Sequence, residues 1–306
     1  MRRSYTFINV PQGLEELSRK DWRGRVEHDP VRFPRRYKSR ADREVAALIA
    51  SSLAYGRADV ASRAIETVMD CLDGSPAKTI RSAGHGEIKD RLGGVKYRFS
   101  GSDDIALFLS AVGEVLRRHG SLERTFLAGF DAGEMDIRAA LARFTTLLRS
   151  YAALLSRKRG LSHGFRHLVP DAGNGSPLKR LLLFLRWVVR PDDGIDLGLW
   201  SGVPPSSLVI PLDTHVFRIG GYLGLHDRRS PVWAAAREIT DSLRRVDPAD
   251  PLRFDFPLCH LGMSGACPVR RDPAKCAACP LRPACKACRG ERKRSRISPE
   301  SRGRLG

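Results

Sequence analysis

The chain has 306 residues, of which 42% are hydrophobic, so it can bury a large core in one or two domains. No apolar run approaches the roughly 18 residues that span a bilayer and no signal-peptide pattern is present, so we expect a cytoplasmic protein without a membrane partner. The 53 lysine and arginine residues exceed the 34 aspartate and glutamate residues, which gives a net charge of +19. We favour binding to nucleic acid as the reason for this charge over the alternative that most proteins of the source proteome are basic.

Helical periodicity dominates the first half of the sequence, and strand signals are scarce. Ser39, with Asp42 three positions later, predicts a capping box at the start of a helix that continues to residue 56. Further helices are expected over residues 58–72 and 103–120, the second with Gly120 as its C-cap, and two more within 122–158. Residues 170–177 combine proline, glycine and asparagine and predict a loop.

Residues 178–191 are apolar nearly all round, which predicts a buried central helix. Lys179, Arg186 and Arg190 nevertheless lie on one stripe of that helix. Buried cations need anionic partners or an opening towards solvent. We expect Arg190 to pair with the acids that follow it, Asp192 and Asp193. We expect a functional role for Lys179, because it comes directly after a glycine-rich loop.

The stretch from Ile210 to Gly224 places one acid, Asp213, at the start of an apolar helical pattern. One interpretation is structural, since aspartate is a favoured N-cap. The other is that the carboxylate, kept ionised by the helix dipole, also faces a substrate. A further helix is expected over 231–247, and the basic, apolar-poor tail at 289–306 is expected to be disordered.

Six of the seven cysteines fall in the last fifty residues, and the seventh, Cys71, is expected in the core. The spacing C-x8-C-x2-C-x5-C is formed by Cys267, Cys276, Cys279 and Cys285. Four closely spaced thiolates can hold a [4Fe–4S] cluster or a structural zinc ion. Paired zinc sites usually separate their two CxxC pairs further, so the spacing favours the cluster and leaves zinc as the alternative. Cys259 and Cys288 receive no role.

These residues together resemble the helix–hairpin–helix DNA glycosylases of the endonuclease III type. The resemblance rests on DTHVFRI at residues 213–219, on the cysteine spacing, and on the helical stretches at 48–68 and 97–120. More narrowly, residues 178–200 and 210–216 resemble a little-characterised bacterial branch of that superfamily. The loop at 168–180 is glycine-rich but lacks the usual hairpin motif. The interval of 34 residues between Lys179 and Asp213 is similar to the layout of archaeal 8-oxoguanine glycosylases.

The resemblance implies an all-α, two-lobed helix–hairpin–helix fold with a C-terminal [4Fe–4S] loop. It implies a barrel-like helical lobe over residues 38–200 that ends in the hairpin region. Residues 1–37 and 201–288 would form a second lobe that carries the cluster loop. The implied partner is double-stranded DNA with a damaged base, bound by a monomer associated with the nucleoid.

The resemblance also implies an activity, base excision by a DNA glycosylase with AP lyase activity. Asp213 would stabilise the positive charge that develops on the sugar, and Lys179 would form a Schiff base. The amine must be neutral to attack, which burial and neighbouring cations such as Arg180 and Arg186 favour. Alternatively, Lys179 contacts phosphate and water is the nucleophile. An oxidised purine is the expected lesion.

The extruded base leaves a gap in the duplex that a wedge residue fills. By the resemblance, Tyr55 takes the wedge position, although packing at a helix end would explain it equally well. The remaining predicted DNA contacts are Arg57, Gly173, Gly175, Ser176, Arg180, Arg186 and His215. Two other functions stay open: a non-catalytic DNA- or RNA-binding protein that keeps the fold and the metal cluster, and a zinc-stapled structural protein.

Overall fold

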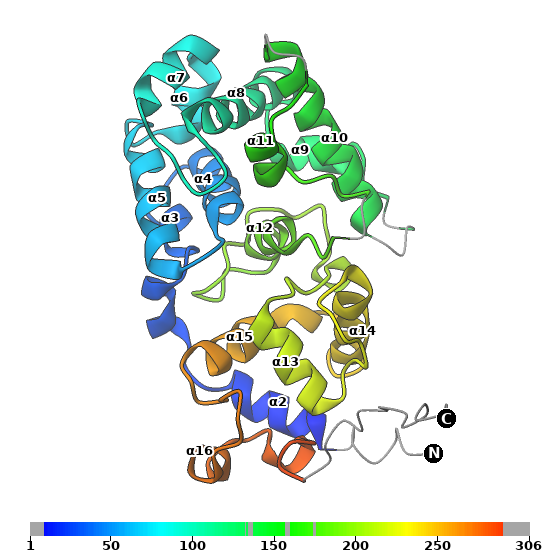
Figure 1. Ribbon diagram of the computed structural model, residues 1–306. Coiled ribbons are helices and arrows are strands. Elements are labelled where there is room, and N and C mark those ends of the chain that lie inside the picture. The colour runs from blue at the N-terminus through cyan, green and yellow to red at the C-terminus, as the bar shows by residue number, and fades with distance from the viewer. Residues whose placement is uncertain (1–8, 132, 134–136, 157–159, 174–175, 290–306) are drawn as a thin grey trace, which may run out of the picture.

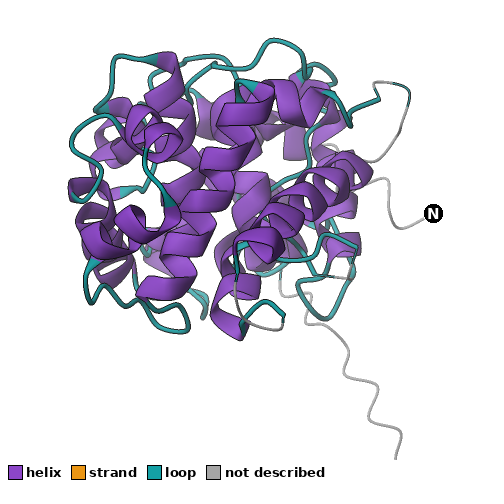
Figure 2. Cartoon of the chain, turned by 90° about the horizontal axis from the view of Figure 1, so that it is seen from above, coloured by secondary structure: helices purple, strands orange, loops and turns teal. Residues whose placement is uncertain are grey.

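The computed structural model describes residues 9–131, 133, 137–156, 160–173 and 176–289. Over these residues the chain consists of helices joined by loops (Figure 2), and the β pairing they contain is an isolated bridge between Tyr97 and Ser100. The predicted all-α class is therefore confirmed for the described residues. Gly175 and the tail from residue 290 onwards lie outside them. Within the described chain, no helix combines the length and apolarity needed to cross a membrane.

The described chain begins with three short elements and continues through longer helices. The α-helices are α2 (Val10–Ser18), α3 (Arg32–Arg35), α4 (Arg40–Leu53), α5 (Ala58–Asp70), α6 (Pro76–Ser82), α7 (His85–Leu92), α8 (Ser102–His119), α9 (Leu122–Leu127), α10 (Ile137–Leu155), α11 (His163–Leu168), α12 (Lys179–Val189), α13 (Thr214–Leu223), α14 (Trp233–Arg244), α15 (Asp255–Met263) and α16 (Pro273–Ala277). Short 3₁₀ helices are η1 (Arg23–His28), η2 (Pro205–Ser207), η3 (Pro251–Phe254) and η4 (Arg282–Ala284).

The two ends of the described chain lie together. In Figure 1, α4 to α11 occupy the upper part of the view, α2 and α13 to α16 the lower part, and α12 lies between them. The N-terminal helix α2 contacts α15, η3 and η4 near the C-terminus, whereas α3 contacts α4. The predicted lobe boundaries at residues 37 and 200 remain predictions.

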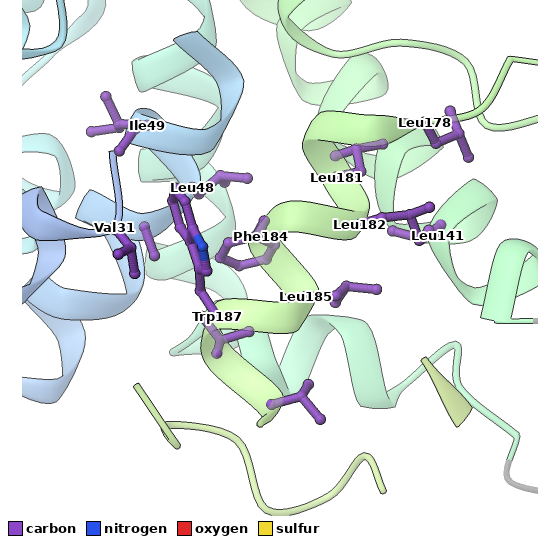
Figure 3. Close-up of a cluster of buried hydrophobic side chains, with 14 of the residues drawn as sticks. Val31, Leu48, Ile49, Leu141, Leu178, Leu181, Leu182, Phe184, Leu185 and Trp187 are labelled. Atoms are coloured by element: carbon purple, nitrogen blue, oxygen red, sulfur yellow. The ribbon is translucent and has the colours of Figure 1, made fainter. Parts of the chain in front are cut away.

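Helix α12 lies in the core, as its sequence predicts. Its side chains Leu181, Leu182, Phe184, Leu185 and Trp187 are all buried. Figure 3 shows them between Val31, Leu48 and Ile49 on one side and Leu141 of α10 on the other. Burying a side chain of this size contributes about 1.5–3 kcal/mol, so α12 is held firmly between its neighbours. A residue on α12 is therefore placed by a rigid support.

Three predicted helix ends are confirmed. The Ser39 side chain accepts from the Asp42 amide, Gly120 ends α8 with a positive φ, and Asp213 caps α13. The reciprocal half of the predicted capping box is not made, because the Asp42 carboxylate accepts from the Ala77 amide instead, at 2.8 Å. A tertiary contact has taken over the local one.

Candidate active site

The N-terminal end of α12 opens onto a cavity. Lys179 is the first residue of the helix, and it follows Leu178, which is held in the left-handed region at φ +50°. For a residue with a Cβ this conformation costs about 1–2 kcal/mol, and such strain gathers at functional sites. The cavity has a volume of about 380 Å³, and its lining includes Tyr55, His167, Lys179 and Arg180. We refer to it as the Lys179 cavity.

The cations of this cavity have no acidic partner. Among the described residues, no carboxylate lies within ion-pair distance of Lys179 or Arg180. Arg180 instead donates to the backbone carbonyls of Ser52 and His167, and its guanidinium lies 4.9 Å from the centre of the Tyr55 ring. Burial lowers the pKa of Arg180 to about 10. The cavity is thus positive and uncompensated, as a site for an anionic ligand would be.

Aromatic rings form a second wall of the Lys179 cavity. The Tyr55 hydroxyl donates to the Tyr97 carbonyl at 3.2 Å, and the Tyr97 hydroxyl donates to the Tyr55 carbonyl. The His167 ring lies edge-on to Tyr55 at 4.5 Å. Burial, followed by the charge of Arg180, lowers the pKa of His167 to about 4, so its imidazole is neutral at pH 7. Tyr55 is therefore packed in place, the alternative that the sequence left open; acting as a wedge would require it to leave these contacts.

Phe99 is an exposed aromatic residue beside this wall that was not among the residues predicted from the sequence. Its side chain is 54% exposed, and its ring lies 5.1 Å from that of His167. It sits on a tight turn, because Tyr97 and Ser100 exchange both backbone hydrogen bonds and Arg98 adopts φ +51°. A phenylalanine among polar residues directly before a helix start was the available signal.

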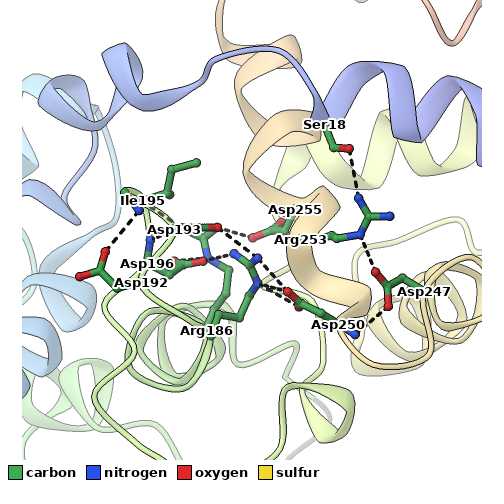
Figure 4. Close-up of polar contacts among 12 residues, drawn as sticks. Ser18, Arg186, Asp192, Asp193, Ile195, Asp196, Asp247, Asp250, Arg253 and Asp255 are labelled. Carbon is green, nitrogen blue, oxygen red and sulfur yellow. Dashed lines mark hydrogen bonds and ion pairs between the residues drawn. The ribbon is translucent and has the colours of Figure 1, made fainter.

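The opposite end of α12 carries cations that are fully compensated. Arg186 is only 2% exposed and pairs with Asp196 at 3.1 Å and with Asp255 (Figure 4). The prediction that Arg186 binds DNA is therefore wrong, because a guanidinium buried between two carboxylates cannot reach a phosphate. Its charge is also matched, so Arg180 is left as the cation neighbouring Lys179.

Of the two predicted partners of Arg190, Asp193 is confirmed and Asp192 is not. Arg190 pairs with Asp193 at 3.2 Å, and also with Asp196 and Asp250. Asp192, the other expected partner, pairs instead with Arg35 at 2.7 Å and Arg43 at 3.3 Å. The chain leaves α12 at Arg190 in an extended conformation, so the turn that follows presents neighbouring acids to different cations.

Asp213 is fixed through both oxygens of its carboxylate. One oxygen accepts from the Val216 amide at 2.7 Å, which is the predicted N-cap of α13. The other accepts from the thiol of Cys259 on α15 at 2.9 Å. Asp213 remains partly accessible. It is not among the residues that line the Lys179 cavity within the described chain, and the predicted convergence of Lys179 and Asp213 on one sugar stays a prediction.

The neighbour of Asp213, His215, packs against α15. A Cβ at Gly262 would lie 2.6 Å from the Cβ of His215, so any side chain at this position would force α13 and α15 apart. His215 therefore takes part in a helix contact, and its predicted contact with DNA stays a prediction.

The other predicted DNA contacts lie on the surface. Arg57 is exposed and pairs with Asp59 at 3.2 Å, and Ser176 lines the Lys179 cavity. The Gly173 amide, expected to meet a phosphate, donates to Asp171 at 2.8 Å within its own loop. An interface with DNA would compete with that local hydrogen bond.

The C-terminal cysteines surround a second, smaller cavity, which we call the cysteine cavity. Its volume is about 30 Å³, and five thiols line it: Cys267, Cys276, Cys279, Cys285 and Cys288. All seven cysteines of the chain are free thiols. In the described residues no three cysteine, histidine or acidic side chains converge on one metal-ion position. The thiol of Cys288 lies against those of Cys276 and Cys285, and burial with these neighbours raises its pKa to about 12.

Helix α13 links Asp213 to the cysteine cavity. Arg218, just over one turn from Asp213, reaches the cysteine segment with its guanidinium. It donates to the backbone carbonyls of Cys267 and Pro268 at 2.8 and 2.9 Å, and it lies 3.5 Å from the Cys267 sulfur. Donors to sulfur are a recurring feature around bound thiolates. A change in the conformation of the cysteine segment would therefore alter the hydrogen bonds of Arg218 on α13.

The fold and the two cavities define an all-helical protein with a positively charged cavity, a fixed carboxylate and a cysteine-rich segment. Over residues 29–264 the chain matches the family described as Protein of unknown function (DUF2400), and it belongs to that family. The match contains Lys179, Asp213 and Cys259 and ends before the five cysteines that line the cysteine cavity. No curated protein and no solved structure matches the chain.

Proposed function

We propose that this protein is a DNA glycosylase with AP lyase activity, which removes a damaged base from double-stranded DNA. The observation that carries the proposal is the Lys179 cavity. A lysine begins a buried helix there, beside Arg180 and two aromatic rings, and neither the lysine nor the arginine has an acidic partner in the described chain. The net charge of +19 supports binding to a polyanion. The two-lobed helix–hairpin–helix fold implied by the sequence is part of the same proposal.

In the proposed reaction, the neutral amine of Lys179 attacks C1′ of the deoxyribose. The C1′–N bond breaks, and the damaged base departs with the electron pair of that bond and takes up a proton. The attached amine then loses a proton, and O4′ takes up a proton as the C1′–O4′ bond opens to give a Schiff base. Loss of a C2′ proton from the Schiff base expels the 3′ phosphate.

Asp213 would stabilise the positive charge that develops on the sugar. A carboxylate held by two donors is aimed before the reaction begins, and preorganised charge of this kind is among the largest contributions to catalysis. Its two hydrogen bonds, from Val216 and Cys259, leave lone pairs on both oxygens for the substrate.

Phe99 is the residue we propose to fill the gap left by the extruded base. It is exposed, it is carried on a hydrogen-bonded turn, and Arg98 lies beside its ring at 5.7 Å. Stacking of an aromatic side chain on neighbouring bases contributes about 1–3 kcal/mol per base. Tyr55, whose hydroxyl is engaged with Tyr97, would stay in the wall of the Lys179 cavity.

The cysteine cavity is the proposed position of a [4Fe–4S] cluster, with zinc as the alternative. The donor set fits such a group, since five free thiols line one small cavity and Arg218 donates towards one of them. Cys267, Cys276, Cys279 and Cys285 would hold it, and when bound it would stabilise the fold of the cysteine segment. Brown colour and iron content of anaerobically purified protein would support a cluster; a colourless protein with stoichiometric zinc would support the alternative.

The function is tested by borohydride trapping on duplexes that each carry one lesion, beginning with oxidised purines. The parent protein should form a covalent adduct with one of them. Lys179→Ala should form none, and Asp213→Asn should form far less. Lys78→Ala, which removes an exposed lysine on α6, is the matched control and should behave like the parent.

Two results would contradict the proposal. Full excision and trapping by Lys179→Ala and Asp213→Asn would remove both residues from the reaction. Tight binding of DNA with no excision of any lesion by the parent would favour the non-catalytic binding protein instead. Excision without trapping by the parent would retain the glycosylase and replace the lysine with water as nucleophile.

A further inference from the structure

Helix α15 contacts both α12, which begins with Lys179, and α13, whose N-cap is Asp213. Asp255 and Cys259 are four residues apart and therefore lie on the same face of α15. Asp255 pairs with Arg186 of α12, two turns beyond Lys179. Cys259 donates to Asp213 at the start of α13. This face of α15 therefore contacts both α12 and the start of α13, and it helps to fix the two helices relative to each other.

The Cys259 thiol is held in its protonated form, so that it can act as a donor. Burial raises its pKa well above the ordinary value, and the negative charges of Asp213 and Asp255 act in the same direction. The sulfur lies 2.9 Å from the second oxygen of Asp213 and 3.6 Å from the sulfur of Met263. A thiol has one hydrogen to donate, and the carboxylate oxygen is the best acceptor within its reach.

Two further features secure this contact. The first oxygen of Asp213 is occupied by the Val216 amide at 2.7 Å, so the Cys259 hydrogen bond fixes the remaining rotation of the carboxylate. The close approach of α13 and α15 at Gly262 sets the distance between the two elements. Cys259 is also absent from the five thiols of the cysteine cavity, so its role is independent of any cofactor there.

We propose that Cys259 is a positioning residue for Asp213. Its thiol holds the carboxylate in the orientation needed at the sugar, without itself touching the substrate. A thiol is a weak donor, so it orients the carboxylate while withdrawing little of the negative charge that the reaction uses. This inference rests on the proposed glycosylase function and adds to it a residue that the sequence left without a role.

The test compares Cys259→Ala and Cys259→Ser in single-turnover base excision, with the Kd for an uncleavable duplex and the Tm measured alongside. Cys259→Ala should slow excision roughly ten- to hundredfold, the cost of a slightly misplaced catalytic group, and leave Kd unchanged. Cys259→Ser retains a donor of similar size and should recover most of the rate. Cys71→Ala, which removes the half-buried thiol at the end of α5, is the matched control and should excise at the parent rate.

The outcomes separate this inference from the proposed function. If Asp213→Asn is inactive and Cys259→Ala keeps the parent rate, the positioning role is wrong and the glycosylase stands. If Asp213→Asn is as active as the parent, the proposed function itself fails. Should Cys259→Ala unfold, Cys259→Ser decides: a folded serine variant as slow as Asp213→Asn overturns the role, and a rate near that of the parent supports it.

Discussion

The two ends of α12 differ in how their cationic side chains are paired. At the C-terminal end, Arg186 and Arg190 are buried and share the carboxylate of Asp196, while Asp255 pairs with Arg186 and Asp250 with Arg190. At the N-terminal end, Lys179 and Arg180 face a cavity of about 380 Å³ and have no acidic partner in the described chain. One helix therefore carries both neutralised and unneutralised cations.

The difference separates a structural charge from a functional one. A buried cation with matched carboxylates fixes the loop after α12 and the start of α15, and breaking such a group is costly. An unmatched cation in a cavity gives the fold little stability but attracts and orients an anion. Position on one stripe of a helix does not distinguish a structural cation from a functional one. The distinction comes from the acidic partners that other segments of the chain contribute.

The largest expected effect on stability belongs to the compensated end. Asp196→Asn removes the carboxylate shared by Arg186 and Arg190 and should lower the free energy of unfolding by about 3–5 kcal/mol. Urea denaturation measures it. Lys179→Ala, at the other end of the same helix, should change that free energy by less than about 1 kcal/mol. Equal losses in the two variants would contradict the comparison.

The cavity end can be probed through DNA affinity rather than stability. Phe99→Ala removes an exposed ring and should weaken binding to a lesion-bearing duplex roughly tenfold, with the Tm unchanged. Fluorescence anisotropy measures the Kd. Leu154→Ala, which removes the 80% exposed side chain near the end of α10, is the matched control. A similar loss in both variants would mean that the Lys179 cavity does not mark the DNA-facing side.

Local signals accounted for much of the fold. The buried helix at 179–189, the N-cap at Asp213 and the C-cap at Gly120 follow from apolar periodicity and from the chemistry of one or two residues. No helix was predicted from the sequence for α15, which contains Pro257. That proline lies in the first turn, where its missing amide has no intrahelical partner to lose, so the helix forms.

The candidate site was less accessible from the sequence, because its decisive features are long-range. Arg186 and Lys179 look alike on a helical stripe, and only the folded structure, which brings Asp196 and Asp255 to Arg186, shows that Arg186 is compensated. The hydrogen bond between Cys259 and Asp213 joins residues 46 positions apart, and no local sequence pattern predicts it. Phe99 had only a weak local signal, its place among polar residues before a helix start, and its exposure and its position beside the Lys179 cavity required the fold.

The smallest predicted effect uses His167 as a reporter of the unneutralised charge. Its pKa is lowered to about 4, first by burial and then by Arg180, His163 and Arg98. As the pH falls, the unfolded chain takes up a proton on His167 near pH 6.5, whereas the folded protein does so only near pH 4. The contribution of neutral His167 to stability is therefore complete above about pH 6.5 and is lost as the pH falls towards 4.

His167→Phe keeps the ring contacts with Tyr55 and Phe99 and removes the titration. Its Tm should therefore fall less than that of the parent between about pH 7 and pH 5. His28→Gln, which replaces an exposed histidine, should follow the parent. If His167→Phe and the parent show the same pH dependence, the cations around His167 are screened and the contrast between the two ends of α12 is weaker than the contacts indicate.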